Sequence, residues 1–206
     1  KYGPGRSTII TLNNSFHGRT ITTLKATGQE VFHNYFFPFT EGFRYADAND
    51  MDSLLAAAGD DVCAVMVELV QGEGGVRALD ADYLQAVAAF VKEQDILLMV
   101  DEVQTGNGRT GKLYGYMHFG IQPDIVSTAK GLGGGLPIGA TLMSEKVQSV
   151  LGPGDHGSTY GGNPVCCAGA ISVIERLDDG FLGKVKRRSG YVMASLYGPP
   201  GIESVS

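Results

Sequence analysis

Charged side chains stand at or near the ends of three successive apolar runs of this chain. Glu68 lies near the end of DVCAVMVELV, Asp101 directly follows ILLMV, and Lys130 directly follows PDIVSTA. A carboxylate after a buried run must be paired or used in chemistry, because burying an unpaired charge is costly. A partly buried lysine has a lowered pKa, which makes its amine a usable nucleophile for Schiff-base chemistry. These three positions carry the main functional signal of the sequence.

Lys130 has more than one interpretation. A lysine between a strand and a loop is most often a solvated side chain. Here small residues surround it, namely Ala129, Gly131 and Gly133–Gly135, and they leave room for a bulky planar ligand. A nucleotide-binding phosphate loop is a weaker alternative, because the lysine of that motif follows the glycines, whereas Lys130 precedes them.

Asp101 also has alternatives. It is suited to capping the following loop, or to binding magnesium like the aspartate that ends a strand in an ATPase. The chain lacks GxxxxGK[ST], so a nucleotide site would have no phosphate loop. A carboxylate and a lysine at the ends of neighbouring strands also suit pyridoxal 5'-phosphate. There the lysine would form the imine with the aldehyde, and the aspartate would keep the ring nitrogen protonated.

Strand-like and helix-like segments alternate along the chain, and this order is what would bring these side chains together. The alternation predicts an α/β fold with a mostly parallel sheet flanked by helices. Ligands of such sheets bind beyond the carboxyl ends of the strands, and the polar residues there are Glu68, Gln71, Glu73, Asp101, Gln104 and Lys130. We expect strands at 7–12, 61–70, 96–100, 123–129 and 140–144, and helices at 51–59, 80–95, 163–179 and 184–198.

Two shorter features complete this outline. The aromatic-rich segment 31–45 is broken by Pro38 and Gly42, so we interpret it as irregular cover over a pocket or an interface. Asp50 or Asp52 is expected to cap the helix 51–59.

Composition limits the function classes. The 206 residues are 43% hydrophobic and 18% charged, an ordinary globular balance. A net charge of −6 argues against general binding to nucleic acid or anionic membranes, and no apolar run reaches the ~20 residues needed to span a bilayer. Cys63, Cys166 and Cys167 offer neither a disulfide framework nor metal spacing, so we expect a reducing cytoplasm and no metal. The start KYGPGRST lacks Met, which predicts that the true N-terminus lies upstream.

Five segments, in order and with matching spacing, resemble the class III (ornithine-type) pyridoxal-phosphate aminotransferases. They are SFHGRT, VELVQGEGGV, LLMVDEVQTGNGRTG, PDIVSTAKGLGGGLPIGA and HGSTYGGNP. Within that class, SFHGRT and GGGLPIGA are most similar to the acetylornithine group. The resemblance implies the large domain of a fold-type I pyridoxal-phosphate transferase. It also implies transfer of the ω-amino group of N-acetylornithine, or of a similar donor, to 2-oxoglutarate in arginine biosynthesis.

The resemblance assigns four residues to the cofactor ring. Lys130 matches the Schiff-base lysine, which would also move a proton between substrate and cofactor carbons. Asp101 matches the partner of the pyridine nitrogen, and Gln104 matches the residue that bonds the ring hydroxyl. Phe16 matches the aromatic that stacks on the ring; otherwise it is an ordinary loop-anchoring phenylalanine.

Further residues match substrate and subunit contacts. Arg19 matches a substrate-carboxylate binder, for which a guanidinium is suited, and otherwise is a surface arginine. Glu73 matches a glutamate that masks a second, C-terminal arginine, which binds a carboxylate. Glu68, in the same stretch, is expected to support the residues of the site and not to contact the ligand. Thr159, with Ser158 beside it, matches a hydroxyl that reaches the cofactor phosphate of the neighbouring subunit. This implies a homodimer with shared active sites.

Some features depart from the family pattern. Leu69 stands where the family usually has proline, which a strand end tolerates. The upstream phosphate loop of the SGAEAN type and the C-terminal small domain have no match. We therefore expect residues 1–198 to form an incomplete cofactor-binding large domain and 199–206 to begin the link to the small domain. A piece of this kind should bind the cofactor weakly and lack most activity.

Other functions stay open at this point. Ornithine, 4-aminobutyrate and succinylornithine aminotransferases, a glutamate-semialdehyde mutase and decarboxylating relatives share these motifs. A non-enzymatic alternative is an inactive fragment that keeps only a dimerisation surface, built from the segment 31–45 and the HGSTYGGNP loop.

Overall fold

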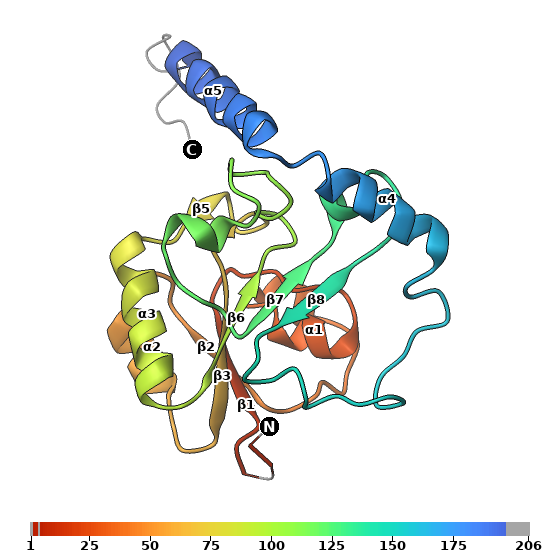
Figure 1. The fold of residues 1–206 in the computed structure, drawn as a ribbon. Helices are drawn as coiled ribbons and strands as arrows, with labels where there is room; N and C mark the ends of the chain where they lie inside the picture. The colour runs from red at the N-terminus through yellow and green to blue at the C-terminus, as the bar shows by residue number, and fades with distance from the viewer. Residues whose placement is uncertain (1, 4, 197–206) are drawn as a thin grey trace.

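Six strands form one twisted sheet in a computed structural model that describes residues 2–3 and 5–196 (Figure 1). The spatial order is β2–β1–β3–β6–β7–β8, and only β8 runs antiparallel to its neighbour. The predicted α/β fold with a mostly parallel sheet is confirmed. The bounds are β1 Thr8–Leu12, β2 Phe43–Ala46, β3 Val62–Glu68, β6 Leu97–Asp101, β7 Ile125–Thr128 and β8 Ala140–Met143.

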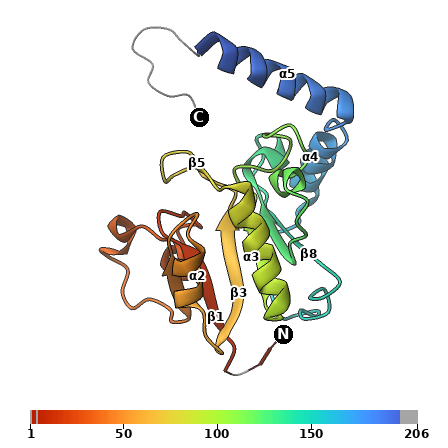
Figure 2. The same ribbon diagram turned by 90° about the vertical axis from the view of Figure 1, so that its left-hand side faces the viewer.

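Helices connect the strands and cover the sheet. Figures 1 and 2 show α2 and α3 together on one face, and α5 projecting away from the sheet in both views. The α-helices are α1 Ile21–Ala26, α2 Met51–Ala57, α3 Ala81–Glu93, α4 Pro164–Ile174 and α5 Asp179–Leu196. Short 3-10 helices are η1 Glu30–His33, η2 Gly115–His118 and η3 Lys130–Gly133, and a small hairpin pairs β4 Val70–Gln71 with β5 Arg77–Ala78.

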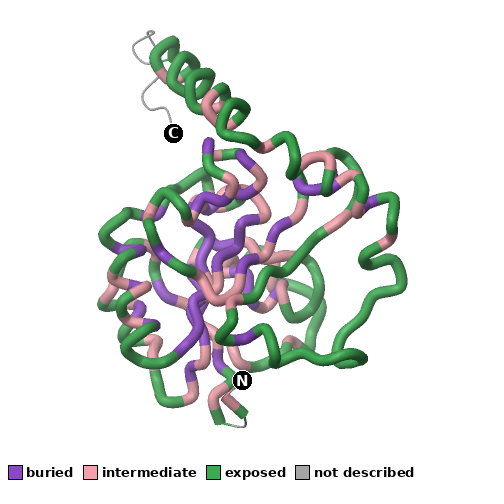
Figure 3. Tube along the Cα trace, viewed as in Figure 1, coloured by how far each residue is buried: buried purple, intermediate pink, exposed green. Residues whose placement is uncertain are grey.

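The core follows the two-residue period of the strands. Ile10, Val65 and Leu98 point to the face that α2 and α3 cover, where Leu54 and Leu84 are 0% and 1% exposed. Ala64 and Leu97 belong to a second, smaller cluster, as expected when both faces of a parallel sheet are covered. Figure 3 shows the buried residues concentrated along the central strands. None of the helices in the described part of the chain is long and apolar enough to cross a membrane.

Three expectations about the elements need correction. The predicted helix 163–179 is α4, which already ends at Ile174, so residues 175–178 lie between α4 and α5. Phe43–Ala46, inside the segment interpreted as irregular, is strand β2 and pairs in parallel with β1. The last helix begins at Asp179 instead of 184, because the Asp178 side chain accepts a hydrogen bond from the Phe181 N–H at 2.7 Å and starts the helix there. The end of the predicted helix 184–198 and the link at 199–206 lie partly or wholly outside the described residues.

The structure shows the expected helix cap and gives the register of the strands. Asp50 caps α2 by accepting a 2.9 Å hydrogen bond from the Ser53 N–H. In the sheet, Glu68 of β3 lies opposite Asp101 of β6, which in turn lies opposite Ser127 of β7. The carboxyl ends of the three strands therefore meet at one edge of the sheet, and Lys130 begins η3 just beyond it.

Candidate active site

Asp101 is held by two donors at the end of β6. Its Oδ2 lies 2.9 Å from His17 Nδ1, and its Oδ1 accepts a 3.1 Å hydrogen bond from the Val103 N–H. The His17 side chain is fully buried and the Asp101 side chain is 8% exposed. The other ring nitrogen of His17 is buried without a partner among the residues the structure describes, which favours the tautomer protonated on Nδ1. Asp101 is thus oriented as an acceptor with lone pairs left for a further donor.

Glu68 lies behind this pair and not in the open part of the site. Glu68 is 5% exposed, and its carboxylate accepts a 2.8 Å hydrogen bond from the Phe16 N–H. Burial raises the pKa of Glu68 to about 7, although the Phe16 hydrogen bond and the nearby His17 act in the opposite direction. This position fits the supporting role expected for Glu68, because the side chain fixes the backbone of the loop that carries Phe16.

Lys130 occupies a strained backbone position at the sheet edge. Its φ angle is +48°, in the left-handed region that non-glycine residues rarely adopt. Such strain is commonly found at functional sites. The partial burial expected for Lys130 was wrong, because this residue is exposed in the structure.

Asn107 fixes the strand end that leads into Lys130. Its Nδ2 donates to Thr128 Oγ1 at 2.8 Å and to the Ala129 carbonyl at 3.0 Å. The loop after β6 is therefore tied to the end of β7. This contact links the segment that carries Gln104 with the segment that carries Lys130.

A cavity of about 600 Å³ joins three of the predicted residues. Lys130, Gln104 and Glu73 all line it, and Gln104 Nε2 donates to Glu73 Oε1 at 3.2 Å. Gly72 makes room for this arrangement, because a Cβ there would lie 2.7 Å from the Gln104 amide. The remaining walls come from the loop 103–110 and from Phe181 and Val185 of α5.

Arg19 and Phe16 form a separate cluster with Phe32. The Arg19 guanidinium carbon lies 5.4 Å from the centre of the Phe16 ring and 4.4 Å from the centre of the Phe32 ring. The two rings meet edge-to-face at 5.6 Å. Phe16 directly precedes His17, so the cluster adjoins the Asp101 pair.

Ser158 and Thr159 are not brought to the other residues. Both are exposed, and neither lines the cavity that contains Lys130. Ser158 Oγ instead accepts a 3.1 Å hydrogen bond from the Gly161 N–H within its own loop. Their expected contact with the cofactor of a neighbouring subunit stays a prediction.

Sequence reasoning missed three residues of this site. His17 stands inside the quoted motif SFHGRT, and a buried carboxylate needs a donor, so its role as partner of Asp101 had a visible signal. Asn107 and Phe32 gave no such signal, because an uncharged amide or an aromatic ring does not by itself require a particular partner.

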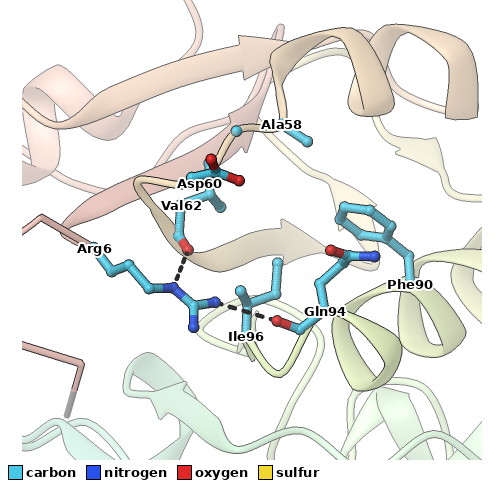
Figure 4. Close-up of a pocket in the computed structure, with 8 residues that line it drawn as sticks. Arg6, Ala58, Asp60, Val62, Phe90, Gln94 and Ile96 are labelled. Atoms are coloured by element: carbon cyan, nitrogen blue, oxygen red, sulfur yellow. Dashed lines mark hydrogen bonds between the residues drawn. The ribbon is translucent and has the colours of Figure 1, made fainter.

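A second cavity lies at the opposite end of the strands. Ala58, Val62, Phe90 and Ile96 line it, with Arg6 at its side (Figure 4). The Arg6 guanidinium donates to the carbonyls of Val62 and Gln94, both at 3.2 Å. Because Arg6 is engaged by backbone carbonyls, this cavity offers no group of convergent catalytic side chains comparable to that at the carboxyl ends.

Comparison with known proteins agrees with this geometry. Residues 1–197 match the family of class III aminotransferases, and the chain belongs to that family. An acetylornithine aminotransferase from Haemophilus ducreyi is 55% identical over 207 residues, covering 100% of this chain and 53% of that relative. One from Caldanaerobacter subterraneus is 51% identical, covering 95% of this chain and 50% of that relative. The chain therefore spans about half the length of the curated relatives it matches.

Solved structures give the same fold. An ornithine aminotransferase from Toxoplasma gondii superposes with a TM-score of 0.91 at 37% identity, covering 98% of this chain and 50% of that chain. An N-acetylornithine aminotransferase from Stenotrophomonas maltophilia gives a TM-score of 0.76 at 34% identity, covering 98% and 48%. Another structure of the Toxoplasma gondii enzyme contains pyridoxal phosphate at partial occupancy in its active site. The family is pyridoxal-phosphate dependent, so the expected fold type and cofactor class are confirmed.

The residues at the sheet edge fit the ring of that cofactor. A pyridine nitrogen needs a carboxylate, and Asp101 is an oriented one with acceptor capacity left. An aldehyde needs an accessible amine, and the exposed Lys130 lies just beyond β7, the strand next to β6. The Phe16 N–H donates to Glu68 at this edge, and Gln104, in the loop after β6, donates to Glu73. The ring end of the cofactor thus has suitable partners within this chain.

Proposed function

We propose that the full-length protein containing this chain is an aminotransferase that moves the ω-amino group of N-acetylornithine to 2-oxoglutarate. The products are glutamate and a semialdehyde, in the course of arginine biosynthesis. The identities of 55% and 51% to acetylornithine aminotransferases support the donor. The observation that carries the chemistry is the buried His17–Asp101 pair at one strand end, with Lys130 beyond the next.

Pyridoxal phosphate, when bound, supplies an electron sink for the substrate carbon. The chain's own residues would bind and orient it. Asp101 would accept a hydrogen bond from the protonated ring nitrogen, and His17 Nδ1 holds the Asp101 carboxylate in place for it. Lys130 would hold the cofactor through its aldehyde, and its amine would carry a proton from the substrate carbon to the cofactor carbon. Arg19 would bind the substrate carboxylate, and Glu73 would turn from Gln104 toward a second carboxylate binder.

The proposal also covers the domain, the dimer and the location of the protein. Residues 1–198 would be most of a large domain, because they span about half of each relative. Ser158 and Thr159 would bind the cofactor phosphate of the neighbouring subunit in a homodimer, in line with their exposure here. A cytoplasmic location fits the free thiols of Cys63, Cys166 and Cys167.

Ornithine is a second candidate donor. It is favoured by the TM-score of 0.91 to the ornithine aminotransferase from Toxoplasma gondii, which exceeds the 0.76 found for the acetylornithine enzyme. The two donors differ in the α-amino group, which is acetylated in one and charged in the other.

A donor screen with the full-length protein tests the proposal. Purified protein loaded with pyridoxal phosphate would be assayed for glutamate formation from 2-oxoglutarate with N-acetylornithine, ornithine, succinylornithine and 4-aminobutyrate. We expect the highest kcat/KM for N-acetylornithine. A preference for ornithine would replace the donor, and absence of turnover with every ω-amine would reject the proposed function.

A further inference from the structure

We propose that Phe32 is a positioning residue that holds Arg19 and Phe16 in their working orientations. This inference rests on the proposed function, in which Arg19 binds a substrate carboxylate and Phe16 faces the cofactor ring. Phe32 comes from η1, outside every motif that marks the site in the sequence. It is half-buried, whereas Tyr35, Phe36 and Phe37, which follow it closely in the chain, are exposed.

The geometry places Phe32 in contact with both residues at once. Arg19 lies closer to Phe32 than to Phe16, with its guanidinium carbon 4.4 Å from one ring centre and 5.4 Å from the other. Phe32 meets Phe16 edge-to-face at 5.6 Å and 72°. A cation over a ring face and two rings at this angle are both favourable arrangements. Without the Phe32 ring, Arg19 and Phe16 would therefore each lose a contact that fixes the orientation of the side chain.

Phe32 is itself fixed to the loop that carries Phe16. The Gln29 side chain, just before η1, donates to the Ser15 carbonyl at 3.0 Å, and Ser15 Oγ accepts from the Gly28 N–H at 3.0 Å. At the other end of η1, His33 Nε2 lies 2.9 Å from the Leu24 carbonyl. These contacts hold η1 against the SFHGRT loop, so the position of Phe32 is determined before any ligand binds.

Arg19 keeps its hydrogen-bonding groups available. Within the described part of the chain, no hydrogen bond or ion pair engages its guanidinium, and the side chain is exposed. Stacking orients a guanidinium plane without using its N–H donors, which stay free for a bidentate carboxylate. An ion pair with an acidic residue would have oriented Arg19 but would have competed with the substrate.

The test uses the full-length protein and glutarate, a dicarboxylate that lacks the reacting carbonyl group. Phe32→Leu removes the ring at similar volume, Phe32→Tyr keeps it, and Tyr35→Leu is a matched control at an exposed aromatic of the same segment. Each change would be made alone, and Phe32→Leu also together with Arg19→Gln. Calorimetry gives the dissociation constant of glutarate from loaded protein, and absorbance titration gives that of pyridoxal phosphate.

We expect Phe32→Leu to weaken glutarate binding by about two- to fivefold and cofactor binding by about two- to tenfold. Phe32→Tyr and Tyr35→Leu should leave both unchanged. In the Arg19→Gln background, Phe32→Leu should no longer affect glutarate, which a merely structural role would not explain. The inference would be overturned if Phe32→Leu weakened glutarate binding equally in the wild-type and Arg19→Gln backgrounds. It would also be overturned if Phe32→Leu caused no loss of glutarate binding while Arg19→Gln abolished it. If wild-type protein binds neither ligand, the proposed function fails and the inference fails with it.

Discussion

At the level of single residues, two neighbouring carboxylates of the site differ in their surroundings. Asp101 and Glu68 lie opposite each other in the register of β6 and β3. They differ in their donors: Asp101 has the His17 ring and the Val103 N–H, while the donor to Glu68 is the Phe16 N–H. Burial raises the pKa of Glu68 to about 7, so this carboxyl is partly protonated near neutral pH.

Replacing Glu68 should change how stability depends on pH. The folded-state pKa of about 7 lies above the ordinary value of 4.5, so the folded protein binds more protons between these values. Wild-type stability contributed by this group is present below pH 4.5 and is lost as the pH rises toward 7. Glu68→Gln, which keeps an acceptor for Phe16, should gain stability relative to wild type over this range, by at most about 3 kcal/mol.

Thermal melting from pH 4.5 to 8 measures this effect. Glu93→Gln, at an exposed glutamate of α3, is the control and should follow the wild-type curve. A wild-type curve parallel to that of Glu68→Gln across the whole range would contradict the assigned protonation.

His17 should matter as a hydrogen-bond donor and not as a ring. His17→Ala leaves a buried carboxylate without its Nδ1 partner, which costs roughly 1.5–3 kcal/mol of unfolding free energy. His17→Asn retains a side-chain N–H on the same side and should recover most of that loss. Urea unfolding of both variants measures the difference. Equal destabilisation by alanine and asparagine would show that packing, not donation, is what His17 supplies.

At the level of elements, the connection between β6 and η2 holds the site together. Glu102 follows Asp101, is 0% exposed and accepts hydrogen bonds from Thr105 Oγ1 at 2.6 Å and from the Gly115 and Tyr116 N–H groups at 3.0 and 2.8 Å. One buried carboxylate thus closes the loop that carries Gln104, Asn107 and part of the cavity wall.

Loss of this carboxylate should open the loop. Glu102→Ala leaves three donors unsatisfied in a buried position and should cost roughly 3 kcal/mol or more. Glu102→Gln keeps one acceptor atom and should cost less. Hydrogen exchange of residues 103–118 gives the local effect, which should exceed any change in α3. Uniform loss of protection across the sheet would mean that Glu102 stabilises the whole fold and not this connection.

The strands and their polar ends could be predicted because they depend on local patterns. Continuous apolar runs marked β3, β6 and β7, and the parallel arrangement then placed Glu68, Asp101 and Lys130 at one edge. Strand β2 was missed, because four residues in an aromatic segment show no period that distinguishes them from a loop. The exposure of Lys130 and the contacts of Phe32 depend on neighbours far away in sequence, which no local pattern reports.

At the level of the whole molecule, two regions contribute little to the buried core of the described residues. Helix α5 has no buried residue in its described part, and the loop with Ser158 and Thr159 is exposed. Both observations agree with a chain that spans about half the length of its curated relatives. The proposed dimer would give the loop its ligand, the cofactor phosphate of the neighbouring subunit.

Sedimentation of the full-length protein tests this arrangement. We expect a dimer, and Thr159→Val should weaken cofactor binding by about 10- to 100-fold, because a hydrogen bond to a charged group is lost. The dimer mass should not change, and Thr159→Ser should bind the cofactor normally. A monomer that retains the cofactor and turns over would reject shared active sites.

The covalent attachment point of pyridoxal phosphate tests the central claim most directly. Full-length protein would be loaded with the cofactor, reduced with borohydride and digested, and the modified peptide would be located by mass spectrometry. We predict that the pyridoxyl group is on Lys130, and that Lys130→Ala protein loses both the modified peptide and the visible absorbance of the cofactor. A pyridoxyl group on a different lysine, or an unchanged spectrum in Lys130→Ala, would contradict the account.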